Sequence, residues 1–246
     1  MMNWNQLISA KRFGMEEFHE ERQENRSEFQ RDYDRLIFSA PFRRLQNKTQ
    51  VFPLPGSVFV HNRLTHSLEV ASVGRSLGDD VAKALLERHP ELQDSFLPEI
   101  GSIVSAACLA HDLGNPPFGH SGEKAISTFF SEGKGVRLKE KQPNGEQLSP
   151  MEWEDLTHFE GNANAFRILT HQFEGRRKGG FVLTYTTLAS IVKYPFSSSL
   201  AGTKSKFGFF ISEEESFQKI ATELGLTLLN EHPLKLSLIH ISEPTR

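Results

Sequence analysis

The sequence predicts a mainly α-helical fold with one short β-hairpin. Two observations support this prediction. Apolar residues recur at helical spacing in most periodic segments, and residues 63–88 show the clearest stripe. Its members are Leu64, Leu68, Ala71, Leu77, Val81 and Leu85. At residues 49–60, two short β-prone runs flank a Pro-Leu-Pro-Gly turn, which is typical of a hairpin.

The remaining elements follow from the same patterns. Helices are predicted at residues 98–112, from Ser121, from Gly161 and at residues 183–192. Residues 15–34 are highly charged and indicate a solvated helix or arm. Residues 131–157 are polar and rich in turn formers, so we expect an exposed insertion there. Residues 206–211 are short enough to be either a strand or a loop.

Composition limits the class of protein. The 246 residues include 28 Lys and Arg against 31 Asp and Glu, which excludes a generally basic coat for nucleic acid. The single cysteine, Cys108, lies in an apolar run, so no disulfide framework is expected and a reducing compartment is favoured. The first residues lack the apolar core of a signal peptide, and no apolar run approaches the ~20 residues of a membrane span. We therefore expect a cytoplasmic protein with no membrane partner.

Positive charge is concentrated in one segment. Between Arg35 and Leu68 there are five basic residues and no acidic one. They are Arg35, Arg43, Arg44, Lys48 and Arg63. On a chain with net negative charge, this segregation favours a small anionic ligand. The alternative is a basic face that pairs with the acidic arm before it.

The stretch "CLAHDLGNPPFGH", residues 108–120, holds the strongest candidate site. An apolar helix runs into His111 and Asp112, and Gly114 and two prolines then turn the backbone before His120. A His-Asp pair alone is common at helix caps. Here His66, near the start of the earlier helix, supplies a further imidazole. Imidazole and carboxylate together suit a divalent cation.

Three motifs give the chain a specific resemblance. The stretches "HNRLTHS", "AACLAHDLGNPPFGHSGE" and "HFEGNANAFRIL" resemble the HD-domain superfamily, and within it the deoxynucleoside triphosphate (dNTP) triphosphohydrolases of the bacterial dGTPase type. "FRRLQNKTQVF" and "LTYTTLASIVKYP" also fit that family. The resemblance runs from about Ile37 to His232. It implies an HD-domain helical fold.

The resemblance also implies roles for individual residues. The metal ligands are His66, His111 and Asp112, and they would hold a divalent ion, Mg²⁺ or Mn²⁺ first, with Fe or Zn as alternatives. His120 and Glu123 match a catalytic histidine and its acidic partner, at the i and i+3 positions of one helical face. The remaining matches are His158 as a further catalytic histidine near the phosphates, Arg63 on the α-phosphate and Gln50 on the sugar.

Three of these assignments have a simpler structural alternative. Glu123 could be a first-turn acid favoured by the helix dipole. Arg63 could be an exposed helix residue. His158 could be an ordinary residue at the start of a helix that follows a loop.

The implied reaction is metal-dependent hydrolysis of a dNTP, with dGTP as the first candidate, to a deoxynucleoside and inorganic triphosphate. The alternatives are another HD-domain nucleotide phosphohydrolase, or a protein that binds a nucleotide or single-stranded nucleic acid through a vestigial site. Related enzymes are often oligomers, and some are activated by nucleotides. The resemblance therefore suggests a homo-oligomer and a nucleotide or single-stranded DNA effector as partners.

The end of the chain departs from this family pattern. Residues 236–246, "LSLIHISEPTR", resemble a non-native tail, and we divide the chain into an arm with a hairpin (1–60), an HD domain (61–235) and this tail. The resemblance implies a fourth metal ligand, an aspartate in a helix after a "HPL" segment. His232-Pro233-Leu234 is present, but no aspartate follows it. We therefore expect a truncated chain with impaired turnover.

Overall fold

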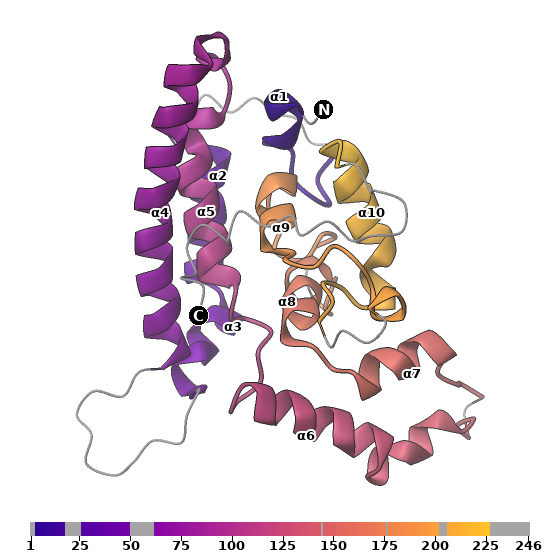
Figure 1. Ribbon diagram of the computed structural model, residues 1–246. Helices are drawn as coiled ribbons and strands as arrows, with labels where there is room; N and C mark the ends of the chain where they lie inside the picture. Colours follow the sequence, from indigo (N-terminus) through magenta and orange to yellow (C-terminus); the bar gives the residue numbers. More distant parts are fainter. Residues whose placement is uncertain are drawn as a thin grey trace, which may run out of the picture.

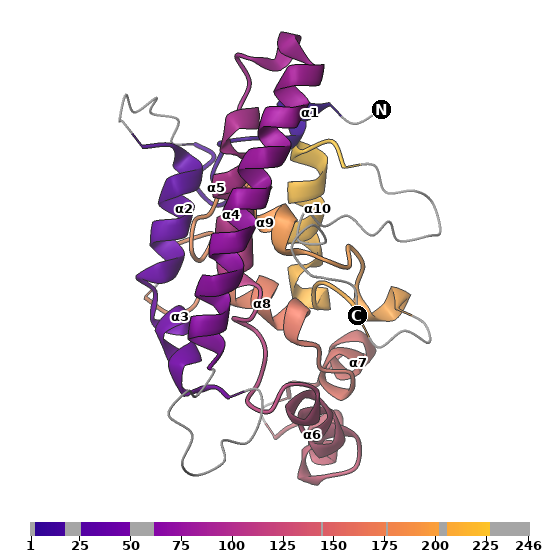
Figure 2. The same cartoon turned by 60° about the vertical axis from the view of Figure 1, so that its left-hand side comes forward.

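Helix α5 (Ile100–Ala110) lies at the centre of a helical fold (Figures 1 and 2). The computed structural model describes residues 3–17, 26–49, 62–143, 145–175, 177–201 and 206–226. All eleven residues of α5 are buried, and the helix packs against α4 (Arg63–Arg88), α2 (Glu28–Ile37) and α9 (Tyr185–Ile191). Burial on every side explains why its sequence is apolar or small throughout. The predicted mainly α-helical fold is therefore confirmed.

Helix α4 is confirmed, but its buried face differs from the predicted leucine stripe. The buried residues are Arg63, Ser67, Ala71, Gly74, Gly78 and Ala82, and only Ala71 belongs to the predicted stripe. The reason is the close approach of α4 to α5. A Cβ atom added at Gly78 would lie 2.7 Å from the Cα of Gly101, and one added at Gly74 would lie 2.8 Å from the Sγ of Cys108. Small residues let the two backbones approach, and Leu64, Leu68 and Leu85 pack at the edges of the contact.

The N-terminal elements are fastened to the core by a buried ion pair. They are α1 (Trp4–Leu7), α2 and α3 (Ala40–Arg44), and Ser27 and Ser39 cap the last two helices. Arg12 pairs with the fully buried Asp32 at 2.7 Å. Asp32 also accepts hydrogen bonds from the backbone N–H and the hydroxyl of Thr184, at the start of α9. The segment before α2 therefore joins α2 to α9.

Residues 131–157 contain more regular structure than their polar composition suggests. After α6 (His120–Ser131), a 3₁₀ segment spans Lys134–Lys139 and helix α7 spans Pro150–Thr157. Ser149 and Glu152 form a reciprocal capping box around the proline at the first position of α7. The buried Asp155 accepts hydrogen bonds from the Ser198 hydroxyl and the Ile211 N–H. These long-range contacts, which composition does not reveal, hold the insertion against the fold.

The second half of the chain completes the bundle. Helices α8 (Gly161–Thr170) and α9 confirm the predicted segments, and α10 (Glu214–Glu223) packs on α9. Further 3₁₀ segments are Leu45–Asn47, Pro90–Leu92, Leu97–Glu99, Ser198–Leu200 and Ile211–Glu213. Residues 206–210 form a loop with one isolated parallel bridge, between Ser197 and Phe209.

Two sequence-based expectations concern the hairpin and the membrane. Residues 50–61, which carry nearly all of the predicted β-hairpin, lie outside the described residues. An isolated antiparallel bridge joins Thr49 to Asn62, the residues that flank this segment. Among the described helices, none is long and apolar enough to cross a membrane.

Candidate active site

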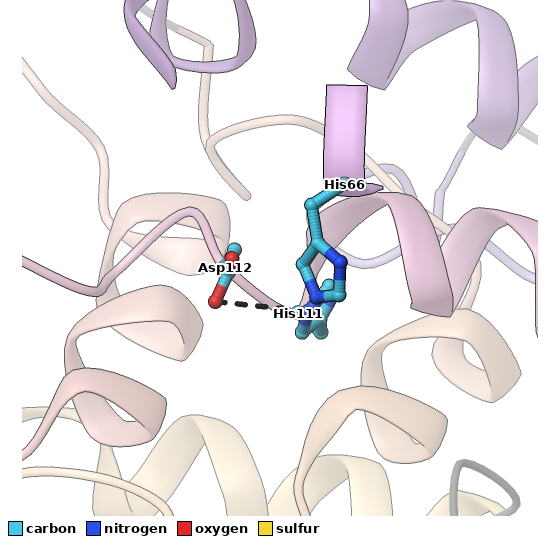
Figure 3. Close-up of side chains that lie close together, drawn as sticks. All are labelled: His66, His111 and Asp112. Atoms are coloured by element: carbon cyan, nitrogen blue, oxygen red, sulfur yellow. Dashed lines mark ion pairs between the residues drawn. The ribbon is translucent and has the colours of Figure 1, made fainter. Parts of the chain in front are cut away.

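The three predicted metal ligands come together at the lower ends of α4 and α5 as seen in Figure 1. His66 lies in the first turn of α4, and His111 and Asp112 directly follow α5. One ligand atom from each residue lies within 4.8 Å of the other two. The imidazole centroids of the two histidines are 5.3 Å apart, and Figure 3 shows Asp112 beside them. The packing of α4 on α5 therefore builds the cluster.

The loop after α5 turns sharply to bring further residues to this cluster. Gly114 packs against α8 so closely that a Cβ atom would lie 2.1 Å from the backbone of Gly161 and of Ala165. Phe118 and Gly119 both have positive φ angles, 66° and 55°. A positive φ is uncommon for a bulky residue such as Phe118, and such strain persists only where the surrounding structure enforces it. The turn ends at Gly119, which lies near Arg63, and α6 begins at the next residue, His120.

The geometry of His111 suits a metal ligand. Its Nδ1 lies 2.5 Å from the carbonyl oxygen of Cys108, and because a carbonyl only accepts, Nδ1 must carry the proton. Nε2 is then left with its lone pair, 3.6 Å from Asp112 Oδ1. A backbone carbonyl that fixes the tautomer in this way is typical of metal-binding histidines. His111 is thus oriented to donate from Nε2.

Asp112 is held as an ionised carboxylate. Burial by itself would raise its pKa, but the charge of Arg63 and the hydrogen bonds from Arg63 and Asn115 lower the pKa below its ordinary value. Asn115 donates from Nδ2 at 2.6 Å, and Arg63 lies 2.9 Å away. Two imidazoles and one ionised carboxylate form a donor set that fits a divalent cation. The residues present can therefore hold the metal that the sequence predicts.

Arg63 is buried, so the alternative of an exposed helix residue is wrong. Its side chain is 3% exposed and pairs with Asp112, and within the described part of the chain its Nε has no hydrogen-bond partner. Lys48 lies nearby and donates to the carbonyls of Leu113 and Asn115. Burial and the charge of Arg63 lower the pKa of Lys48. Two members of the basic segment thus contact the loop after α5.

His120 and Glu123 form the predicted pair. Their Nδ1 and Oε2 atoms are 2.8 Å apart, and the imidazole is 85% exposed. Glu123 is 13% exposed, and its Oε1 accepts the N–H of Gly161 at 2.9 Å. Burial opposes ionisation, but hydrogen bonds from His120 and Gly161 and the charge of Lys206 keep the pKa of Glu123 below its ordinary value. The ionised carboxylate accepts the Nδ1 proton, which leaves Nε2 of His120 available for chemistry.

Backbone contacts connect this pair to the metal ligands. A Cβ atom added to Gly119 would lie 3.4 Å from Arg63 Nη2, so the residue before His120 adjoins the Arg63–Asp112 ion pair. Asn115, which donates to Asp112, also lies against Gly161, where an added Cβ would be 1.9 Å from its Oδ1. Two residues that contact Asp112, Arg63 and Asn115, therefore also lie beside residues adjoining the His120–Glu123 pair.

The structure does not join every predicted residue to this site. Gln50 lies outside the described residues. His158 ends α7, is 57% exposed and contacts Glu154 and Thr157 of its own helix. Within the described chain it touches neither the metal ligands nor His120. Its catalytic role stays a prediction.

Other residues at the site escape sequence reasoning. Asn115 and Gly161 lie inside the quoted motifs, but the sequence assigned no role to either residue. Glu160 and Lys206 form an ion pair at 2.7 Å behind Glu123, and they are far apart in the sequence. No local pattern could have paired them.

A family model supports this reading of the site. Residues 63–179 match the HD domain. The chain therefore contains an HD domain over these residues. The matched HD domain begins with α4, contains all three metal ligands and the His120–Glu123 pair, and continues beyond α8.

Named relatives extend the similarity of the HD domain to most of the chain. A deoxyguanosinetriphosphate triphosphohydrolase-like protein of Synechocystis sp. is 46% identical over 92% of this chain and 52% of its own length. A second protein of the same description, from Pseudomonas aeruginosa, is 45% identical over 95% of this chain and 53% of its own length. The deoxyguanosinetriphosphate triphosphohydrolase of Yersinia enterocolitica is 36% identical over 95% of this chain and 51% of its own length. The chain thus spans about half the length of the curated relatives it matches.

Proposed function

We propose that this chain carries the active site of a dNTP triphosphohydrolase, with dGTP as the first candidate substrate. The observation that supports it best is the metal cluster His66, His111 and Asp112 beside an exposed His120 backed by Glu123. The names of the relatives support the same substrate class. The products would be a deoxynucleoside and inorganic triphosphate.

The three clustered ligands would hold the metal ion, with Mg²⁺ or Mn²⁺ as our first assignment and Fe or Zn as alternatives. When bound, a divalent cation supplies charge neutralisation for the phosphates and activation of the attacking water.

Arg63 and Lys48 would bind the phosphates. Both lie against the loop that carries Asp112 and Asn115, and both bring positive charge to the metal site. A charge-assisted contact from a buried guanidinium also stabilises the charge that develops on the α-phosphate during attack. By resemblance, Gln50 would contact the sugar and His158 the phosphates.

His120 would act as the general acid. A water molecule attacks the α-phosphorus and gives up a proton to the solvent, and the bond from that phosphorus to the 5′ oxygen breaks. The 5′ oxygen takes the Nε2 proton of the imidazolium form of His120. Glu123 accepts the Nδ1 hydrogen bond and stabilises the imidazolium form before the transfer.

The setting we propose is the cytoplasm, which agrees with the free, buried Cys108. The homo-oligomer and the nucleotide or single-stranded DNA effector stay predictions, because they rest on the resemblance alone.

The deciding experiment is product analysis. The purified chain is incubated with each dNTP and with Mg²⁺ or Mn²⁺, and nucleoside and triphosphate are separated by chromatography. Equimolar deoxynucleoside and triphosphate support the proposal. Release of phosphate or pyrophosphate instead would indicate another phosphohydrolase. Binding without turnover, in a version extended to the length of the relatives, would indicate a vestigial site.

The matched variant is His120→Ala. Because general acid–base catalysis contributes about 10²–10⁴-fold, we expect turnover to fall at least about 100-fold. Its side chain is 85% exposed and is not a ligand of the cluster, so bound metal and the melting temperature should stay unchanged. Loss of bound metal together with activity would show that His120 has a different role.

A further inference from the structure

His120 is held in place by a single contact. Its imidazole is 85% exposed, and within the described chain its one hydrogen bond is the 2.8 Å contact from Nδ1 to Glu123. No core packing restrains such an exposed ring. The orientation of the ring therefore depends on the orientation of the Glu123 carboxylate.

The Glu123 carboxylate is in turn fixed from behind. Its Oε1 accepts the N–H of Gly161, and its Oε2 lies 3.5 Å from Lys206 Nζ. The same ammonium lies 2.7 Å from Oε1 of Glu160, which is 1% exposed. One cation thus bridges two carboxylates from different elements, α6 and the start of α8.

Without that cation, the two carboxylates would face each other across a partly buried space. Glu160 cannot move away, because its Oε2 caps α8 by accepting the N–H groups of Asn162 and Ala163. Repulsion between like charges in a poorly solvated space is strong. Glu123 would keep its hydrogen bonds to Gly161 and His120 but is the more exposed of the two carboxylates, so it is the one expected to rotate, and its rotation would displace His120.

Lys206 is itself held by tertiary structure. The next residue, Phe207, is 1% exposed and packs in a small apolar cluster with Phe196 and Phe210. Gly208 donates to the Phe196 carbonyl at 3.0 Å. An added Cβ at Gly208 would lie 2.0 Å from the Tyr194 carbonyl oxygen, so the loop lies tightly on its support. The backbone next to Lys206 is therefore held in a defined position, which limits where its ammonium can lie.

We propose that Lys206 is a positioning residue: its ammonium, anchored on Glu160, fixes the Glu123 carboxylate that orients His120. The inference deepens the proposed function and rests on it for the role of His120. Lys206 is 30% exposed, so the competing role is direct contact with substrate phosphate.

The first test reads the imidazole itself and requires no turnover. The whole chain is labelled with ¹⁵N-histidine, His120 is assigned with His120→Gln, and the Nδ1 and Nε2 shifts are recorded with the imidazole neutral. In the parent chain we expect a ring protonated at Nδ1. In Lys206→Met the two shifts should move toward each other as tautomers exchange, and in Lys206→Arg they should stay at the parent values.

The matched control is Lys124→Met. Lys124 lies on α6 next to Glu123, is exposed, and takes no part in the bridge. The Lys124→Met variant removes the same charge as Lys206→Met and should leave the His120 shifts unchanged. Should Lys206→Met lose its circular dichroism signal, Lys206→Gln removes the charge and keeps a hydrogen-bond donor, and the same convergence of shifts is expected.

The second test separates positioning from substrate binding. A misplaced catalytic group costs up to about 100-fold, so Lys206→Met should lower kcat roughly 10–100-fold and leave KM within about twofold. Lys206→Arg should recover kcat to within about threefold of the parent, since it restores the charge.

Two results would overturn the proposal. Unchanged His120 shifts in folded Lys206→Met would show that the bridge does not orient the ring. A raised KM with kcat retained would make Lys206 a substrate contact. If neither the parent chain nor a version extended to the length of the relatives releases triphosphate, the proposed function is defeated instead, and the histidine spectra still decide the role of Lys206.

Discussion

At the residue scale, Arg63 is as much a structural residue as a candidate phosphate ligand. From the sequence alone, Arg63→Ala would weaken nucleotide binding without unfolding the protein. Its burial and its ion pair with Asp112 change that expectation. Removal of one partner leaves the other charge buried and poorly paired, which typically costs about 3–5 kcal/mol.

We therefore predict that Arg63→Ala lowers the free energy of unfolding by about 3 kcal/mol in metal-free buffer. Added Mn²⁺ should recover part of that loss, because a cation on Asp112 replaces the missing charge. Chemical denaturation with and without Mn²⁺ measures both effects. The control is Arg26→Ala, whose ion pair with Asp34 is 60% exposed on the arginine side and should matter by less than about 1 kcal/mol. Equal losses in the two variants would contradict the prediction.

At the scale of elements, the capping box of α7 is a local device with a local effect. Ser149 accepts the N–H of Glu152, and Glu152 accepts the N–H of Ser149. Ser149→Ala should cost about 1 kcal/mol, the usual value for a lost N-cap. We expect faster amide hydrogen exchange in α7 and unchanged exchange in α5. Ser131→Ala, at the exposed end of α6, is the control and should leave α7 unaffected.

The contact of the N-terminal segment with α9 and α10 should be sensitive to acid. Burial tends to raise the pKa of Glu16, but hydrogen bonds from Lys219 and Tyr185 lower it to about 2. Because the pKa is lowered on folding, the contact stabilises the fold fully at pH values above 4.5, the ordinary pKa of Glu. This stability is lost as the pH falls toward 2.

The variant Glu16→Gln tests the direction of this pH dependence of stability. The parent should be more stable than the variant at neutral pH, and the difference should shrink between pH 4.5 and about 2. Denaturant titrations across this range measure the difference. A difference that stays constant down to about pH 2 would show that the ionised form of Glu16 does not matter.

At the scale of the whole molecule, a metal ion would tie together the ends of the two most closely packed helices. His66 belongs to α4, and His111 and Asp112 follow the central α5. A ligand that binds only the folded state stabilises it by about 2.7 kcal/mol at one hundred times its Kd.

We predict that Mn²⁺ or Mg²⁺ raises the melting temperature of the chelator-treated chain, as measured by calorimetry. His66→Ala and His111→Ala should abolish the shift, because each removes one of three ligands. His89→Ala is the control, since this histidine is half exposed at the opposite end of α4 and pairs with Glu91. An undiminished shift in His66→Ala would place the metal elsewhere.

The sequence by itself determined what depends on near neighbours along the chain. The period of apolar residues predicted α4, α5, α8 and α9, since helical hydrogen bonds and helix faces repeat within four residues. The motifs containing His66, His111, Asp112, His120 and Glu123 predicted the site, and the structure brings these residues together. Helix α7, within the polar insertion, was missed because its stability also comes from Ser198 and Ile211.

Only the tertiary structure decided which of these side chains are buried and which charges share a partner. The contact of Gly78 with Gly101 set the buried face of α4 and placed Arg63 inside the protein. The bridge of Lys206 to Glu160 and Glu123 exists because α6, α8 and a distant loop meet at one point. Burial and charge pairing depend on distance in space, which the order of residues along the chain does not specify.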